Sequence, residues 1–143
     1  MLPAAPRAAA LFLLCLVAAA PSAARAEAAI SKGILGAWQA KPFTWHVGKV
    51  KGCRYRQHIS IDREVAAGQF EGTYSARTTC AGRAWNLNGR ITVTVSGRTM
   101  TIAGHAKDWI IETVRYISPL RMEGKDARGH PMIYVRPKGA PTS

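Results

Sequence analysis

From about residue 34 onward, apolar and polar residues alternate along short stretches that are separated by glycine-containing turns. In residues 90–95, one isoleucine and two valines occupy every second position, and threonines lie between them. Residues 99–102 repeat this alternation after a turn at Ser96-Gly97. A period of two places successive side chains on opposite faces of a strand. The two stretches therefore predict a β-hairpin with one apolar face.

Two earlier stretches show the same alternation, and each contains one cysteine, Cys53 in the first and Cys80 at the end of the second. An antiparallel pairing that places Ile61 opposite Gly72 buries the apolar residues of both stretches. The same register places the two cysteines opposite each other. Directly opposite residues have Cβ atoms about 4.5–5.5 Å apart, which is near the range that a disulfide requires. We therefore predict one disulfide, between Cys53 and Cys80.

The remaining alternating stretches complete a chain made almost entirely of strands, at residues 34–39, 43–47, 85–87, 109–117, 120–124 and 132–135. No long stretch carries apolar residues at helical spacing, and residues 27–32 are expected to add one helical turn at most. About eight short strands with short connections predict an all-β fold. We expect a small antiparallel up-and-down barrel, with a tight sandwich as the alternative. Asn88-Gly89 is either a tight turn or a bend within one long strand.

The first 26 residues have the pattern of a secretory signal peptide. Arg7 supplies a short basic region, an apolar run extends from residue 8 to residue 20, and Ala24-Arg25-Ala26 follows. The run is too short to span a bilayer, which needs about 20 residues. Cleavage between Ala26 and Glu27 would leave 117 residues, enough for one domain. We expect a periplasmic or secreted protein, with no integral membrane segment after processing and a disordered tail from about residue 137.

Positive charge dominates the chain, with a net charge of +12. Removal of the first 26 residues leaves 18 Lys and Arg against 8 Asp and Glu, a net charge of +10. In the register above, Arg56 lies opposite Arg77 on the outward face, where like charges destabilise a sheet. An anionic envelope component or an acidic protein surface would reverse that effect, although a solvated face of a uniformly basic protein is the alternative. The candidate anion-binding residues are Lys49, Lys51, Arg54, Arg56 and Arg77.

The sequence carries no pattern typical of an enzyme or a metal site. None of the four histidines has the spacing of a metal ligand, and neither a nucleophile elbow nor a phosphate-binding loop is present. A small ribonuclease that uses His105 and Glu112 as acid and base is an open alternative. We expect no catalytic residues, no metal and no cofactor.

Gly36-Ala37-Trp38 resembles the Gly-x-Trp that opens the first strand of calycin-type barrels, which include lipocalins, avidins and a family of small periplasmic protease inhibitors. Residues 70–74 are similar to a strand of the avidins. The resemblance implies structural roles for Gly36 and Trp38. It also implies that Trp38 closes one end of the barrel beneath an arginine from a late strand, either Arg136 or Arg115.

The resemblance also bears on function. The last expected strand, residues 132–135, lacks the acid found in avidins, so biotin binding is not expected. The protease-inhibitor family agrees in size, export and a single disulfide, and it implies that residues 27–33 form an inhibitory arm. We expect a small non-catalytic binding protein of the cell envelope that recognises an anionic partner through its basic face. Inhibition of a protease is the alternative.

Overall fold

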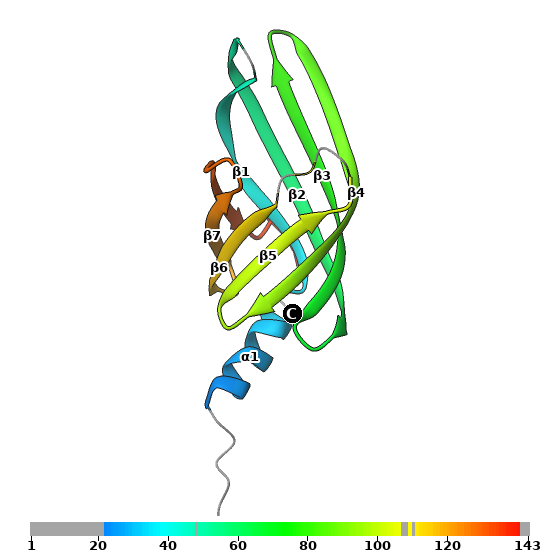
Figure 1. Cartoon of the computed structure of the whole chain (residues 1–143), viewed down its shortest axis with the longest axis vertical. Helices are drawn as coiled ribbons and strands as arrows, with labels where there is room; N and C mark the ends of the chain where they lie inside the picture. The colour runs from blue at the N-terminus through cyan, green and yellow to red at the C-terminus, as the bar shows by residue number, and fades with distance from the viewer. Residues whose placement is uncertain (1–21, 48, 107–108, 110, 141–143) are drawn as a thin grey trace, which may run out of the picture.

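The computed structural model describes residues 22–47, 49–106, 109 and 111–140, which form one helix and a closed antiparallel β-barrel (Figure 1). Each strand pairs with the next in the chain, and β1 pairs with β8 to close the barrel. In order, the elements are α1 (Ser22–Gly33), β1 (Gly36–Val47), β2 (Val50–Ala66), β3 (Gln69–Cys80), β4 (Arg83–Ser96), β5 (Thr99–Gly104), β6 (Glu112–Ser118), β7 (Arg121–Asp126) and β8 (Pro131–Val135).

The barrel and the register of its central strands confirm the sequence prediction. Ile61 of β2 lies opposite Gly72 of β3, and the α-carbons of Cys53 and Cys80 are 4.4 Å apart in a disulfide. Gly89 lies inside the continuous strand β4, so Asn88-Gly89 is not a turn. A β-carbon at Gly89 would lie only 3.1 Å from a ring carbon of its partner Tyr74, which explains the absence of a side chain there.

The structure differs from the prediction at the N-terminal side of the barrel. The twelve-residue helix α1 replaces the single turn expected for residues 27–32. Alanine, the best helix former, occupies much of α1. Among the described side chains of the helix only Ile30 belongs to the buried apolar cluster, so the sequence shows no apolar stripe there. The two early strands expected at residues 34–39 and 43–47 are one strand, β1, whose pairing with β2 is irregular around Pro42.

Two boundaries near the C-terminus also differ from the expected ones. Strand β6 begins at Glu112, whereas the alternation suggested a start at Trp109. Trp109 instead packs against Tyr74 of β3, with ring centroids 4.2 Å apart. After β8, residues 137–140 form a hydrogen-bonded turn, and the rest of the predicted tail lies outside the described residues. Most of the predicted signal peptide also lies outside them.

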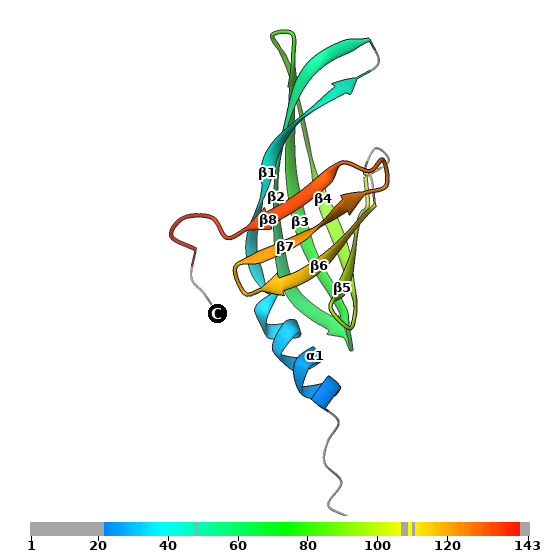
Figure 2. The same cartoon turned by 90° about the vertical axis from the view of Figure 1, so that its left-hand side faces the viewer.

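Strands β1–β4 extend well beyond β5–β8 at one end of the barrel (Figures 1 and 2). Strand β5 pairs with β4 only over Ile91–Ser96, and β8 pairs with β1 only at Gln39 and Ala40. The remaining halves of the long strands therefore form a four-stranded sheet above the barrel's open end. This sheet, called the extension below, comprises residues 43–47, 50–57, 76–80 and 83–87.

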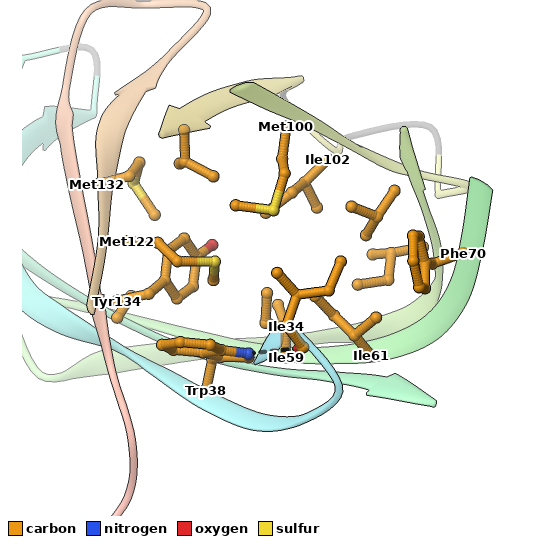
Figure 3. Packing of buried hydrophobic residues seen from close by; sticks show 14 of the residues in the cluster. Ile34, Trp38, Ile59, Ile61, Phe70, Met100, Ile102, Met122, Met132 and Tyr134 are labelled. Carbon is orange, nitrogen blue, oxygen red and sulfur yellow. Dashed lines mark hydrogen bonds between the residues drawn. The ribbon is translucent and has the colours of Figure 1, made fainter. Parts of the chain in front are cut away.

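The apolar core fills the opposite half of the barrel, next to α1 (Figure 3). Trp38 is fully buried there, and its Nε1 donates a hydrogen bond to the carbonyl of Ile34 at 2.8 Å. Ile30 and Ile34 bring the end of α1 and the following residues into the same cluster. Gly36 has a φ of +96°, a left-handed conformation that favours glycine, where the chain turns from α1 into β1.

Arg136, which directly follows β8, covers this end of the barrel. Its guanidinium carbon lies 3.7 Å from the centroid of the Trp38 ring. The guanidinium also donates hydrogen bonds to the carbonyls of Gly33, Ala37 and Pro119, at 2.6, 3.0 and 3.1 Å. One side chain thus links the end of α1, the start of β1 and the turn before β7.

Candidate functional site

A pocket of about 510 Å³ lies at the open end of the barrel, between the inner face of the extension and the ends of β6–β8. This volume is within the usual range for sites that bind small molecules, roughly 300–1,000 Å³. Aromatic rings dominate its walls. They belong to Phe43, Trp45, Tyr55, Trp85 and Trp109.

The alternation of the strands explains why these rings meet. Phe43 of β1 lies opposite Tyr55 of β2, with ring centroids 5.0 Å apart, and Trp45 lies two residues further along the same face. Trp85 of β4 completes the aromatic surface on the far side of the extension and is 51% exposed. A single exposed ring is ordinary on a protein surface, but a contiguous exposed apolar patch is typical of an interaction site or a ligand-binding groove.

A buried polar network forms the floor of the pocket. Glu112 of β6 is only 3% exposed, and Gln57 and Tyr134 beside it are fully buried. The side-chain amide of Gln57 donates to one carboxyl oxygen of Glu112 at 3.0 Å, and the hydroxyl of Tyr134 donates to the other. The hydroxyl of Tyr55, on the pocket wall, donates to the amide oxygen of Gln57. The network therefore connects the wall of the pocket to the carboxyl group at its floor.

Burial sets the ionisation of this network. The pKa of Glu112 is raised to about 7, mainly because burial removes the hydration of the carboxylate. Hydrogen bonds from Tyr134 and Gln57 lower the pKa, whereas the nearby charge of Asp126 raises it. Burial also raises the pKa of Tyr134 and of Tyr55 above the usual value, so both phenols stay protonated and act as donors. Near neutral pH, Glu112 therefore changes between a neutral acid and a carboxylate.

This raised pKa predicts that the free energy of unfolding falls as pH rises from about 4.5 to 7. In that window the unfolded chain releases the proton of Glu112 while the folded chain retains it, so rising pH favours the unfolded state. The shift from 4.5 to about 7 corresponds to a loss of about 3 kcal/mol. Urea unfolding at pH 4 and pH 8 should show this loss in the wild type but not in Glu112→Gln. Equal pH dependence of the two proteins would contradict the assignment.

The rim of the pocket is built from the turn between β7 and β8. His130 Nδ1 lies 2.8 Å from the carboxylate of Asp126, and the imidazole stacks on Phe43 with centroids 5.3 Å apart. Arg128 lies over the ring of Trp45, 5.6 Å from its centroid. Nε1 of Trp45 is buried and has no hydrogen-bond partner among the described residues.

The predicted anion-binding residues lie on the other face of the extension. Arg56 is opposite Arg77, as the sequence register requires, and Arg54 is two residues away on the same face. These three arginines line a shallow groove, called the basic groove below. Lys49 and Lys51 are exposed near the tip of the same hairpin but do not line it. The structure therefore brings three of the five candidates together.

Other candidate chemistry from the sequence does not assemble into a site. His105 is exposed, with its Nε2 2.7 Å from the hydroxyl of Thr92, whereas Glu112 is buried inside the barrel. The ribonuclease pair is therefore separated by the barrel wall. Within the described residues, no group of three or more His, Cys, Asp or Glu is arranged to hold a metal ion. The described helix is too short to cross a membrane.

Sequence reasoning did not identify the pocket, whose residues come from seven strands and two connecting loops. The one local signal in the sequence is that Phe43 and Trp45 occupy alternate positions of a short stretch, which places both rings on one face of a strand.

No protein-family model matches the chain, and the search of curated proteins finds no relative. Interpretation of the site therefore rests on its geometry.

Proposed function

We propose that the protein is a non-catalytic binding protein that takes a small ligand into the pocket at the open end of the barrel. One observation carries this proposal: a pocket of about 510 Å³ combines a largely aromatic wall with a buried, hydrogen-bonded carboxyl group at its floor. An apolar wall with a few placed polar groups is the usual composition of a ligand site. The polar groups of the floor are engaged with one another, which suits recognition better than acid–base chemistry.

Titration with the uncharged fluorescent probe N-phenyl-1-naphthylamine tests the pocket. Saturable enhancement of probe fluorescence is expected for the wild type and should weaken in Trp85→Ala, because that ring forms a wall of the pocket. Ile117→Ala is the matched control, since Ile117 is 43% exposed on β6 and does not line the pocket. Absence of saturable binding, or equal loss in both variants, would refute the proposal.

We also propose that the basic groove binds an anionic envelope component or an acidic protein surface. The supporting observation is that Arg54, Arg56 and Arg77 converge on one exposed groove, where no described acidic residue lines the wall. Mutual repulsion between Arg56 and Arg77 is unfavourable for the sheet alone. An anion in the groove would offset it.

The double variant Arg56→Glu/Arg77→Glu is expected to elute from heparin at markedly lower salt than the wild type. Attraction between exposed charges is screened as the Debye length falls from about 10 Å at 0.1 M salt to about 3 Å at 1 M. Lys41→Glu/Lys138→Glu makes the same change in net charge at exposed positions outside the groove. If both double variants shift equally, the groove has no special role and the basic surface acts as a whole.

Export to the periplasm or the medium remains part of the proposal. It rests on the signal-peptide pattern, and a disulfide is consistent with an oxidising compartment. Mass spectrometry of the exported protein should find Glu27 as its first residue, and an intact N-terminus would contradict export by cleavage.

Protease inhibition stays a prediction from resemblance. The proposed arm, residues 27–33, is helical here and Ile30 is buried in the core, which does not favour it.

A further inference from the structure

We propose that the ligand of the pocket is an organic cation, with its ammonium group at Glu112 and an apolar body between the aromatic rings. This inference rests on the proposed function, because it assigns a chemical class to the ligand of that same pocket. The pocket could bind a small ligand without any preference for a cation, so the two proposals can be tested separately.

The walls suit a cation because five aromatic rings line one space. A cation within about 6 Å of a ring centroid is attracted to the negative face of the ring, most strongly to indole. Three of the five rings are indoles, and they come from different parts of the chain: Trp45 from β1, Trp85 from β4 and Trp109 from the segment before β6. A ligand among them would meet aromatic surface on several sides.

The floor suits a cation because the carboxyl group of Glu112 has no cationic partner among the described residues. The groups around it are the phenol of Tyr134 from β8, the amide of Gln57 from β2 and, opposite it on β7, Asp126. Apolar Ile102 is its partner on β5. None of these groups carries positive charge, and Asp126 opposes ionisation of Glu112.

Among the residues that the structure describes, the basic side chains near the pocket lie at its rim and already have partners. His130 is bound to the carboxylate of Asp126, and Arg128 lies over Trp45. The two ends of the pocket therefore differ in charge type, with a carboxyl group at the floor and basic groups at the entrance. An ammonium group that passes the rim would gain a partner that the empty pocket does not supply.

A second observation indicates that the empty pocket is incomplete. Trp45 lines the same space, and its Nε1 is buried and has no hydrogen-bond partner among the described residues. A buried donor without an acceptor is unfavourable. A ligand with an oxygen near the rim would satisfy it, so the inferred ligand carries its cation at the inner end and an acceptor toward the entrance.

Protonation of Glu112 makes binding of a cation depend on pH. Because burial holds the pKa of Glu112 near 7, a cation can pair with a carboxylate only after the proton leaves. Affinity for a permanently charged cation should therefore rise by up to about tenfold per pH unit below pH 7 and level off above it. A neutral ligand of the same shape should bind without this dependence.

Calorimetric titration with three probes that share a phenethyl-sized body tests the inference. The probes are phenethyltrimethylammonium, uncharged 2-phenylethanol and anionic 3-phenylpropionate, and the protein is the processed wild type at pH 5.5 and pH 8.5. We expect the cation to bind about tenfold more tightly than the alcohol at pH 8.5, where it is attracted to the carboxylate of Glu112. At pH 5.5 it should keep only the smaller preference that the aromatic rings provide. In Glu112→Gln the preference should be small at both pH values.

The outcomes separate this inference from the function on which it rests. If the alcohol or the anion binds as tightly as the cation at pH 8.5, and Trp85→Ala weakens that binding, the pocket is a ligand site but not one for cations. If no probe binds and N-phenyl-1-naphthylamine also fails to bind, the proposed function itself fails. The comparison of probes in the wild type remains decisive even if Glu112→Gln folds poorly.

Discussion

Replacement of Trp38 by alanine is expected to lower the free energy of unfolding by about 3–5 kcal/mol, the usual cost of deleting a large aromatic side chain from a core. Trp38 is fully buried at the α1 end of the barrel. Its removal would leave a cavity beneath Arg136, whose guanidinium lies on the indole ring. The carbonyl of Ile34 would also lose its hydrogen bond from Nε1.

Urea unfolding followed by circular dichroism would measure this loss. Trp85→Ala is the matched control, because it removes the same side chain from a position that is 51% exposed, and we expect it to cost far less. Binding of N-phenyl-1-naphthylamine to the folded fraction of Trp38→Ala should be unchanged, since Trp38 does not line the pocket. A Trp38→Ala protein of wild-type stability that has lost binding would instead make Trp38 a ligand contact.

The region around Trp38 shows how far the sequence could predict the fold. Alternation with a period of two determines which face of a strand is buried, and a shift of one residue would reverse it. This is why the Ile61–Gly72 register, and with it the disulfide, could be predicted and is confirmed. Helix α1 carries no such periodicity, since Ile30 is the only buried residue among its described side chains, and the sequence predicted one helical turn at most, for residues 27–32.

The basic groove and the pocket differ in how much of each was predictable. Arg56 and Arg77 lie on neighbouring strands, so one register places them together. Glu112 meets Gln57 across a separation of 55 residues, and their proximity depends on closure of the whole barrel. It also depends on the different lengths of the strands, which leave the extension standing above the open end (Figure 2). Neither property can be derived from local alternation.

Because the strands differ in length, the outer strands of the extension lack pairing partners on one side, and the disulfide links its two inner strands. Beyond Gln39 and Ala40, β1 has no pairing with β8, and β4 pairs with β5 only from Ile91 onward. Both outer strands of the extension therefore have an unpaired edge. The Cys53–Cys80 disulfide joins the two inner strands near their tip, where β2 begins and β3 ends.

Loss of this disulfide is expected to lower the free energy of unfolding by about 3–4 kcal/mol. The two cysteines are 27 positions apart, and the chain-entropy model gives this value for the loop that they close. Cys53→Ser/Cys80→Ser should therefore unfold at much lower urea than the oxidised wild type. The reduced wild type should behave similarly, and reductant should not alter the double variant.

The same variant is expected to bind the ligand of the pocket weakly even under conditions in which its barrel is still folded. The aromatic wall of the pocket belongs to the extension, and Trp45 lies directly opposite Cys53. Without the disulfide, the tip of the extension should open before the barrel does, because its outer strands lack partners beyond the barrel. Hydrogen exchange should then accelerate at residues 50–56 and 77–80 while the amides of β5 and β6 stay protected. Uniform acceleration across all strands would show that the disulfide stabilises the barrel as a whole and has no particular role in holding the pocket wall.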